Sequence, residues 1–156
     1  TQLVANYGYK GGSTVILFCR YMDALNQFER SIEHRGFPEN GSHVFEWIIA
    51  ENPSAIHPKY YYSSTVSANT GFENVSLNKW TLWVARWTNS SRTSQLFKNN
   101  QVISTYNNHP LLNNITMSSI YSGGNMDLHY AAIYDRPLSD TELTNVYNSF
   151  VGHIQP

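Results

Sequence analysis

Apolar and polar residues alternate, or form short apolar runs, along most of the chain, and turn-forming residues separate these segments. Such spacing is typical of an antiparallel β-sandwich. The run 13–22 is nearly unbroken apolar sequence, which predicts a central strand that is buried on both faces. Further strands are expected at 2–9, 43–51, 59–65, 80–87, 92–98, 115–121 and 127–134, with a polar strand and turn at 66–77.

The strand at 80–87 opens a hairpin. Its polar loop leads into 92–98, and Asn99-Asn100 then predicts a tight two-residue turn, because asparagine tolerates a positive φ angle. Three consecutive antiparallel strands are therefore expected, and the third gives way to a loop at 106–114. Trp80 and Trp83 are assigned to opposite covered faces of the first strand.

Two stretches of the first half have a less regular pattern. Residues 23–35 fit either a short helix or a loop followed by an edge strand, since their apolar residues match helical spacing only in part. Residues 36–42 contain glycine, proline and Asn-Gly, which predict a turn, and the two prolines of 52–58 predict a loop.

The last element carries the clearest local signal. Ser139 and Glu142 form a capping box, in which each side chain binds a free backbone N–H group at the start of a helix. Apolar residues then recur at helical spacing and form one stripe, which consists of Leu143, Val146, Tyr147 and Phe150. A short C-terminal helix is therefore expected to pack on the sheets.

Length and composition narrow the class of protein. At 156 residues the chain fits a single domain, 1–156, with its own core, and its start at Thr1 suggests a domain cut from a longer protein. The net charge of -1 and the absence of a basic run argue against nucleic-acid binding. No apolar stretch approaches the roughly 18 residues that cross a bilayer, so membrane insertion is not expected. Cys19 lies in an apolar run, which predicts a buried, inert thiol.

Three segments of the second half, 78–80, 96–102 and 133–143, resemble the laminin-G-like, concanavalin A-like jelly-roll modules. In that family a tryptophan opens a hairpin strand, an Asn-Gly turn follows, and the module closes with Ile-Tyr-Asp-Arg-Ala-Leu-Ser-Asp-x-Glu-Ile and a short helix. This chain has Ile-Tyr-Asp-Arg-Pro-Leu-Ser-Asp-Thr-Glu-Leu at the closing position. It departs from the family at Asn100, where glycine is usual, and at Tyr130, where an acidic residue is common.

The resemblance implies an all-β fold, an antiparallel two-sheet jelly-roll sandwich with a short C-terminal helix. It also implies carbohydrate binding, cell adhesion or receptor binding through the loops or the concave face. The expected role is a non-catalytic, lectin-like recognition module on an extracellular protein or a virion surface, with a glycan or protein receptor as partner. Two alternatives remain, because one fold hosts many functions: a structural domain of a viral or phage fibre that forms homo-oligomers, and a glycoside hydrolase.

Catalytic and metal-binding patterns are sparse. Glu46 and Glu51 are the nearest candidate pair for a glycosidase, but their odd spacing places them on opposite faces of one strand. The sequence has no nucleophile elbow, no phosphate-binding loop and no close pair of histidines for zinc, and no cofactor is expected. Calcium prefers oxygen ligands, so Asp127 with Asn125 is the candidate calcium site, while a solvated turn also explains these residues.

Aromatic residues make up 14% of the chain and are the positive evidence for ligand binding. Tyrosine and tryptophan offer a flat apolar face with a polar edge, which suits sugar rings and protein hot spots. Trp80, Trp83 and Tyr134 are assigned to the core. Candidate ligand contacts lie nearer to predicted loops, where core or rim positions also explain them: Tyr61, Trp87, Tyr106, His109 and Tyr121.

N-glycosylation sequons occur at Asn40, Asn74, Asn89 and Asn114, a number close to chance in a chain rich in asparagine, serine and threonine. Asn89, in the loop of the predicted hairpin, is the most accessible of them if the protein is secreted by a eukaryote.

Overall fold

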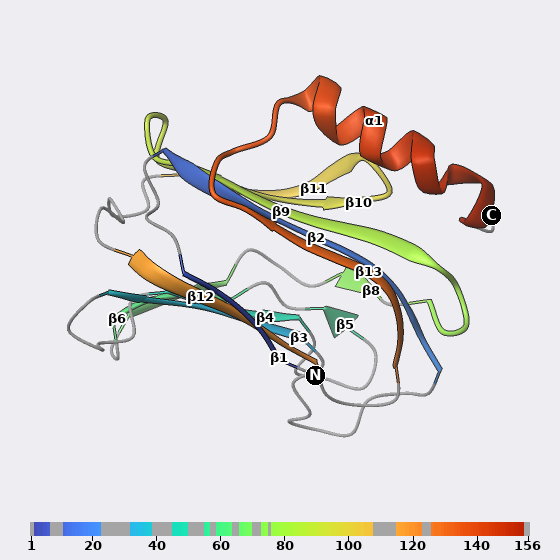
Figure 1. Ribbon diagram of the computed structural model, residues 1–156, viewed down its shortest axis with the longest axis horizontal. Helices are drawn as coiled ribbons and strands as arrows, with labels where there is room; N and C mark the ends of the chain where they lie inside the picture. Colours follow the sequence, from blue (N-terminus) through green and yellow to red (C-terminus); the bar gives the residue numbers. More distant parts are fainter. Residues whose placement is uncertain are drawn as a thin grey trace.

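Two antiparallel β-sheets pack face to face, and one helix covers the outer face of the larger sheet (Figure 1). The computed structural model describes side chains for residues 11–22, 76–107 and 126–154. It describes the backbone alone for 2–6, 32–38, 45–49, 55–56, 59–63, 66–69, 73–74 and 115–122. This arrangement confirms the all-β, two-sheet jelly-roll sandwich with a short C-terminal helix.

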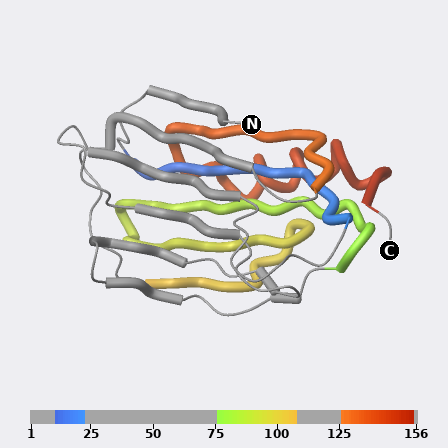
Figure 2. The backbone as a smooth tube through the Cα atoms, turned by 90° about the horizontal axis from the view of Figure 1, so that it is seen from below, coloured from blue at the N-terminus to red at the C-terminus, as the bar shows by residue number. Residues whose placement is uncertain are grey.

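The larger sheet has five strands in the order β11-β10-β9-β2-β13. Figure 2 shows these strands side by side, with α1 behind β13 and β2. Their bounds are Gly12–Tyr21 for β2, Thr81–Thr88 for β9, Thr93–Lys98 for β10, Gln101–Asn107 for β11 and Met126–Tyr134 for β13.

The smaller sheet has four strands in the order β1-β12-β3-β4. They span Gln2–Asn6, Ile115–Ser122, Ile32–Pro38 and Phe45–Ile49, respectively. Two short antiparallel pairs complete the described strands. One pair is β5 (Ala55–Ile56) with β8 (Glu73–Asn74), and the other is β6 (Lys59–Ser63) with β7 (Val66–Asn69).

Strand β2 forms the centre of the core. It pairs with β9 on one side and with β13 on the other, so its backbone is bonded along both edges. Ile16 and Phe18 belong to the cluster that packs under α1, whereas Leu17 and Cys19 alternate with them and point to the opposite face. All four are at most 1% exposed. The prediction of a strand buried on both faces is therefore confirmed, and so is the burial of the Cys19 thiol.

Helix α1 (Asp140–Phe150) packs its apolar stripe on the outer face of the five-stranded sheet. Leu143 is 2% exposed in this cluster and lies with Leu82, Val84 and Phe97 of the sheet. The capping box forms as predicted, since the Ser139 side chain accepts from the Glu142 N–H and the Glu142 carboxylate accepts from the Ser139 N–H. A short 3-10 helix, η1 (Val151–His153), follows α1. Within the described part of the chain, no helix has both the length and the apolar composition for crossing a membrane.

The turn between β10 and β11 also forms as predicted. Asn99 and Asn100 have φ angles of 48° and 66°, and the flanking Lys98 and Gln101 pair with each other. Two consecutive positive φ angles are the geometry of a hairpin turn whose twist matches the flanking strands.

Four strand assignments differ from the sequence prediction, and the first is β5, which lies within the loop expected at 52–58. β3 pairs with both β12 and β4, so it is an inner strand and not the edge strand that was one alternative for 23–35. β3 continues to Pro38, so the turn expected to start at residue 36 does not start there. Pro38 is tolerated because the pairing of β3 with β12 is irregular there, which is the kind of place where a strand accepts proline. β11 continues to Asn107, which places Tyr106 in a strand and not in a loop.

Candidate functional site

A pocket of about 230 Å³ opens on the outer face of the five-stranded sheet, between α1 and the β10–β11 hairpin. In Figure 2, α1 lies behind β13 and β2 and not behind β10 and β11. The lining residues come from four elements: Arg86 of β9, Gln95 and Phe97 of β10, Asn100 and Val102 of the hairpin, and Asp140, Leu143 and Thr144 of α1.

Arg86 fixes one wall of the pocket. Its Nη1 donates to the carbonyl oxygen of Leu138 at 2.8 Å and to Oδ1 of Asp140 at 2.6 Å. Its Nε and Nη2 both donate to Oε1 of Gln95, at 3.2 and 2.7 Å, and its guanidinium carbon lies 4.9 Å from the centroid of the Phe97 ring. All three nitrogens of Arg86 are therefore bound to protein, and its charge is compensated by Asp140.

The hairpin turn fixes the opposite wall. Asn99 donates its backbone N–H to the Leu82 carbonyl at 2.9 Å, and its Oδ1 accepts from the Leu82 N–H at 3.0 Å. Asn100 donates from Nδ2 to Oγ1 of Thr144 at 3.3 Å. The turn is thus bonded to β9 through one asparagine and to α1 through the next.

The pocket combines an apolar base with polar groups that have unused hydrogen-bonding capacity. Phe97 and Leu143 are 5% and 2% exposed and form the base, while Val102 is 50% exposed at the rim. No described residue binds Gln95 Nε2, Asn100 Oδ1 or Asp140 Oδ2. Donors and acceptors around an apolar base suit a small ring that carries hydroxyl groups.

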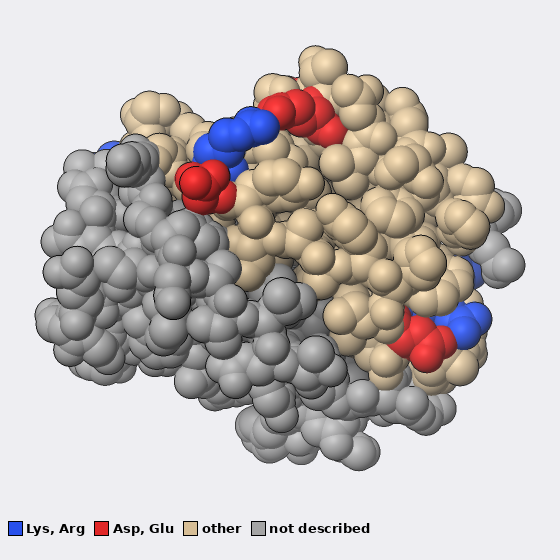
Figure 3. All heavy atoms as spheres, viewed as in Figure 1, with Lys and Arg blue, Asp and Glu red and all other residues tan. Residues whose placement is uncertain are grey.

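Charge on the described surface is sparse. Figure 3 shows most Lys, Arg, Asp and Glu side chains in small groups of mixed sign with uncharged residues between them, and a few further Lys or Arg atoms at the edges of the view. Ion pairs join Arg136 to Glu142 at 2.6 Å and Arg20 to Asp127 at 2.5 Å. The described part of this face therefore has no broad patch of one sign, and it suits recognition by hydrogen bonds and apolar contact.

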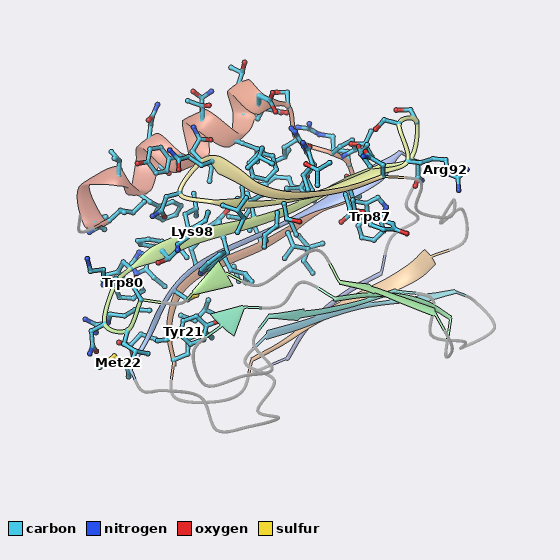
Figure 4. The ribbon with its side chains drawn as sticks, turned by 180° about the vertical axis from the view of Figure 1, so that it is seen from behind. Tyr21, Met22, Trp80, Trp87, Arg92 and Lys98 are labelled. Atoms are coloured by element: carbon cyan, nitrogen blue, oxygen red, sulfur yellow. The ribbon has the colours of Figure 1, made fainter. Side chains whose placement is uncertain are left out.

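Two of the aromatic residues predicted as ligand contacts are brought together. Trp87 of β9 and Tyr106 of β11 both pair with Ser94 of β10, so the three residues form one row across the sheet. Trp87 is 4% exposed, and Figure 4 shows it on the side of the sheet that faces the four-stranded sheet. This position corrects the expectation for Trp87, because its side chain lies in the core between the two sheets and is not part of the pocket lining.

The other predicted ligand contacts do not join this row. Tyr61 lies on β6 opposite Ser67, and Tyr121 lies on β12 between Gln2 and Glu33. The structure describes only the backbone at these two tyrosines, and His109 falls outside the described residues. For Tyr61, Tyr106, His109 and Tyr121, ligand contact stays a prediction.

Asp127 of the suggested calcium site is bound to an arginine. Its Oδ2 accepts from Nε and Nη2 of Arg20, at 3.2 and 2.5 Å, and Arg20 in turn lies 5.1 Å from the centroid of the Trp80 ring. Asn125 lies outside the described residues. Among the residues with described side chains, no group of three or more His, Cys, Asp or Glu is placed to hold a metal ion. The Arg20 guanidinium gives the Asp127 carboxylate a positively charged partner that is not a metal ion.

Two further predicted residues have definite positions. Glu46 lies on β4 opposite Arg35 of β3, which fits the expectation of a polar residue on a strand, whereas Glu51 falls outside the described residues. Asn89 lies in the turn after β9, where its backbone N–H donates to the Gly11 carbonyl at 3.0 Å. The Asn89 side chain is half-buried, with its Oδ1 fully covered.

A cluster of aromatic rings lies at the other end of α1. A bulge between Leu128 and Tyr130 leaves His129 unpaired in β13 and turns it towards the helix. The His129 ring centroid lies 5.8 Å from that of Phe18 and 6.3 Å from that of Phe150. These ring contacts pack the end of the helix on the sheet, and the sequence pattern alone did not indicate them.

No protein-family model matches the chain, and no curated protein matches it. Solved structures do match its fold. The binding domain of botulinum neurotoxin serotype D aligns with a TM-score of 0.71 and 11% identity, over 96% of this chain and 40% of that chain. A Trypanosoma rangeli sialidase in complex with sialic acid aligns with a TM-score of 0.63 and 13% identity, over 93% of this chain and 24% of that one.

A third similar structure comes from work on botulinum neurotoxin type C, whose cell entry is described as dependent on two ganglioside molecules. It has a TM-score of 0.60 and 10% identity, over 95% of this chain and 39% of that chain. This chain thus spans between 24% and 40% of the chains that these three structures contain. At such identities the likeness concerns the β-sandwich fold.

Proposed function

We propose that this chain is a non-catalytic, lectin-like recognition module that binds a glycan on a cell-surface receptor. The observation that carries the proposal is the pocket between α1 and the β10–β11 hairpin, where an apolar base is bordered by amide, hydroxyl and carboxylate groups. Sugars present C–H groups and hydroxyl groups on the same ring, so this combination complements them. The β-sandwich fold, with ligand-binding proteins among its structural neighbours, supports the same role.

We also propose that the chain has no enzymatic activity. Glycosidases use a pair of carboxylates on the two sides of the scissile bond. Asp140 is the one acidic residue that lines the described pocket, and its Oδ1 is already bound to Arg86. A single engaged carboxylate suits a ligand contact better than acid-base chemistry.

The finer assignments are proposals as well. The closing segment 133–143 forms a strand, a turn and a capped helix, as the resemblance to the laminin-G-like closing motif implies, and this supports our proposal that the chain is related to those modules. We further propose that it acts outside the cell or on a virion surface as part of a longer protein.

The test is binding of the chain to a glycan array, together with an assay for sugar release from the same oligosaccharides. Val102→Trp fills the rim of the pocket at a residue that is 50% exposed, and Val151→Trp is its matched control, 47% exposed and not part of the pocket lining. We expect binding by the unmodified chain and by the control, loss of binding in Val102→Trp, and no sugar release.

Two results would contradict the proposal. Sugar release by the unmodified chain would make it a hydrolase. If the chain still binds cells at full strength after enzymatic removal of cell-surface glycans, the ligand is a protein receptor and not a glycan.

A further inference from the structure

We propose, on the basis of the proposed function, that the pocket binds one neutral pyranose ring and discriminates against sugars that carry a carboxylate or a sulfate. Three properties of the lining lead to this ligand class: the free polar groups, the distribution of charge and the size of the pocket.

The free polar groups match hydroxyls and not anions. Oδ2 of Asp140 and Oδ1 of Asn100 accept hydrogen bonds, and Nε2 of Gln95 donates them. The Thr144 hydroxyl accepts from Asn100 and keeps its own proton for donation. A sugar hydroxyl donates and accepts at once, so it can satisfy both kinds of group, whereas a carboxylate or sulfate only accepts.

The charge of the lining disfavours an anion. Arg86 is the one cationic residue of the lining, its side chain is 12% exposed, and its nitrogens donate to Gln95, Leu138 and Asp140. The side chain of Asp140, by contrast, is 86% exposed, so the charge presented at the mouth of the pocket is negative. An arriving anion meets this carboxylate without a free guanidinium to compensate it.

The size of the pocket selects one ring. Its volume of about 230 Å³ lies below the roughly 300–1,000 Å³ of sites for drug-sized ligands, so it accommodates a single ring of a glycan and leaves the rest in solvent. Val102 at the rim offers exposed apolar surface to the C–H side of that ring, while Phe97 and Leu143 close the bottom of the pocket.

The experiment uses an array of matched pairs, each made of a neutral oligosaccharide and the same oligosaccharide capped with sialic acid or sulfate. Thr144→Val removes one hydroxyl of the pocket at nearly constant shape, and Thr141→Val makes the same change on an exposed part of α1 outside the lining. We expect neutral members to bind more tightly than their acidic partners. Thr144→Val weakens that binding about tenfold, and Thr141→Val leaves it unchanged.

Asp140→Asn tests the charge separately, with Asp135→Asn as the control at an exposed position outside the pocket. Removal of the Asp140 charge is expected to narrow the difference in affinity between the neutral and the acidic oligosaccharides. The control Asp135→Asn is expected to leave that difference in affinity unchanged. Circular dichroism of each variant establishes that it is folded. If Thr144→Val does not fold, Val102→Trp serves as the second pocket variant.

The outcomes separate this inference from the proposed function. Binding of acidic members alone would overturn the preference for a neutral ring and leave glycan recognition in place. Neutral binding that is unaffected by both Thr144→Val and Val102→Trp would overturn this pocket as the site. No binding to any member of the array would overturn the neutral-ring inference together with the proposed glycan function.

Discussion

Nη1 of Arg86 lies 2.6 Å from Oδ1 of Asp140, so an ion pair joins β9 to the first residue of α1. The two side chains differ widely in exposure, at 12% for Arg86 and 86% for Asp140. An ion pair with one partner in solvent contributes little to stability, about 0–1 kcal/mol. The bonds of Arg86 to Leu138 and Gln95, which are partly buried, should therefore matter more.

Arg86→Ala and Asp140→Ala measure this difference. Arg86→Ala leaves the Leu138 carbonyl and the Gln95 side chain without their donor and removes the contact with Phe97, so we expect a loss of about 2–3 kcal/mol in the free energy of unfolding. Asp140→Ala should cost about 1 kcal/mol or less. Urea unfolding of both variants gives the comparison. Equal losses would mean that the ion pair itself dominates.

Local sequence signals predicted the parts of the site that depend on neighbouring residues. The capping box at Ser139 and the turn at Asn99-Asn100 each involve residues within four positions of each other, and both formed as predicted. The pocket itself depends on Arg86 reaching Leu138 and Asp140, which follow it by 52 and 54 positions. No periodicity encodes such a pairing, because strand order is decided by the packing of the whole sandwich.

The same dependence on strand order explains why the ligand contact expected of Trp87 was wrong. Trp87 stands next to a predicted loop, which made it a candidate for ligand contact, yet its strand runs through the middle of the five-stranded sheet and buries it. Position along a strand is visible in a sequence. Position across a sheet is not, since it requires the partners of each strand.

Gly12 has a φ angle of 136°, and a Cβ atom added there would lie 2.0 Å from the carbonyl oxygen of Trp87. Both the φ angle and the contact with backbone exclude a side chain, so Gly12→Ala should lower the free energy of unfolding by about 3 kcal/mol or more. Gly11→Ala is the matched control, because a Cβ atom there meets nothing within 4 Å. It should be neutral or stabilising by up to about 1 kcal/mol. Thermal unfolding of the two variants tests this prediction. Similar melting temperatures would contradict the close approach of Gly12 to the Trp87 carbonyl oxygen.

Asn99 and Asn100 both have positive φ angles but different roles. Asn99→Gly relieves the conformational cost yet removes the acceptor of the Leu82 N–H, which is partly buried, so we expect a net loss of about 1 kcal/mol. Asn100→Gly loses only a 3.3 Å bond to Thr144 and gains the residue best suited to a φ angle of 66°, so it should change stability by about 0.5 kcal/mol or less. Urea unfolding measures both. Equal effects would show that the Asn99 side chain adds nothing to the turn.

Cys19 is fully buried, and desolvation raises the pKa of its thiol to about 12. The thiolate is the reactive form, so its population at pH 8 is negligible in the folded protein. We expect no reaction with a thiol-specific reagent under native conditions and one equivalent of reaction in denaturant. Rapid native labelling would contradict the burial. Cys19→Ala, which cannot react, provides the baseline.

The side-chain hydrogen bond from Arg136, followed by the N–H of Ser139, lowers the pKa of Glu142 from 4.5 to about 2. Because this pKa is lower in the folded protein, the carboxylate stabilises the fold fully above pH 4.5, and that contribution is lost as the pH falls towards 2. Glu142→Gln keeps an acceptor for the capping box but does not titrate, so its melting temperature should fall less steeply between pH 5 and pH 2 than that of the unmodified chain. A carboxyl NMR titration measures the pKa directly, and Arg136→Met should move it back towards its ordinary value. A Glu142 pKa near 4.5 in the unmodified chain would show that the Arg136 contact does not persist in solution.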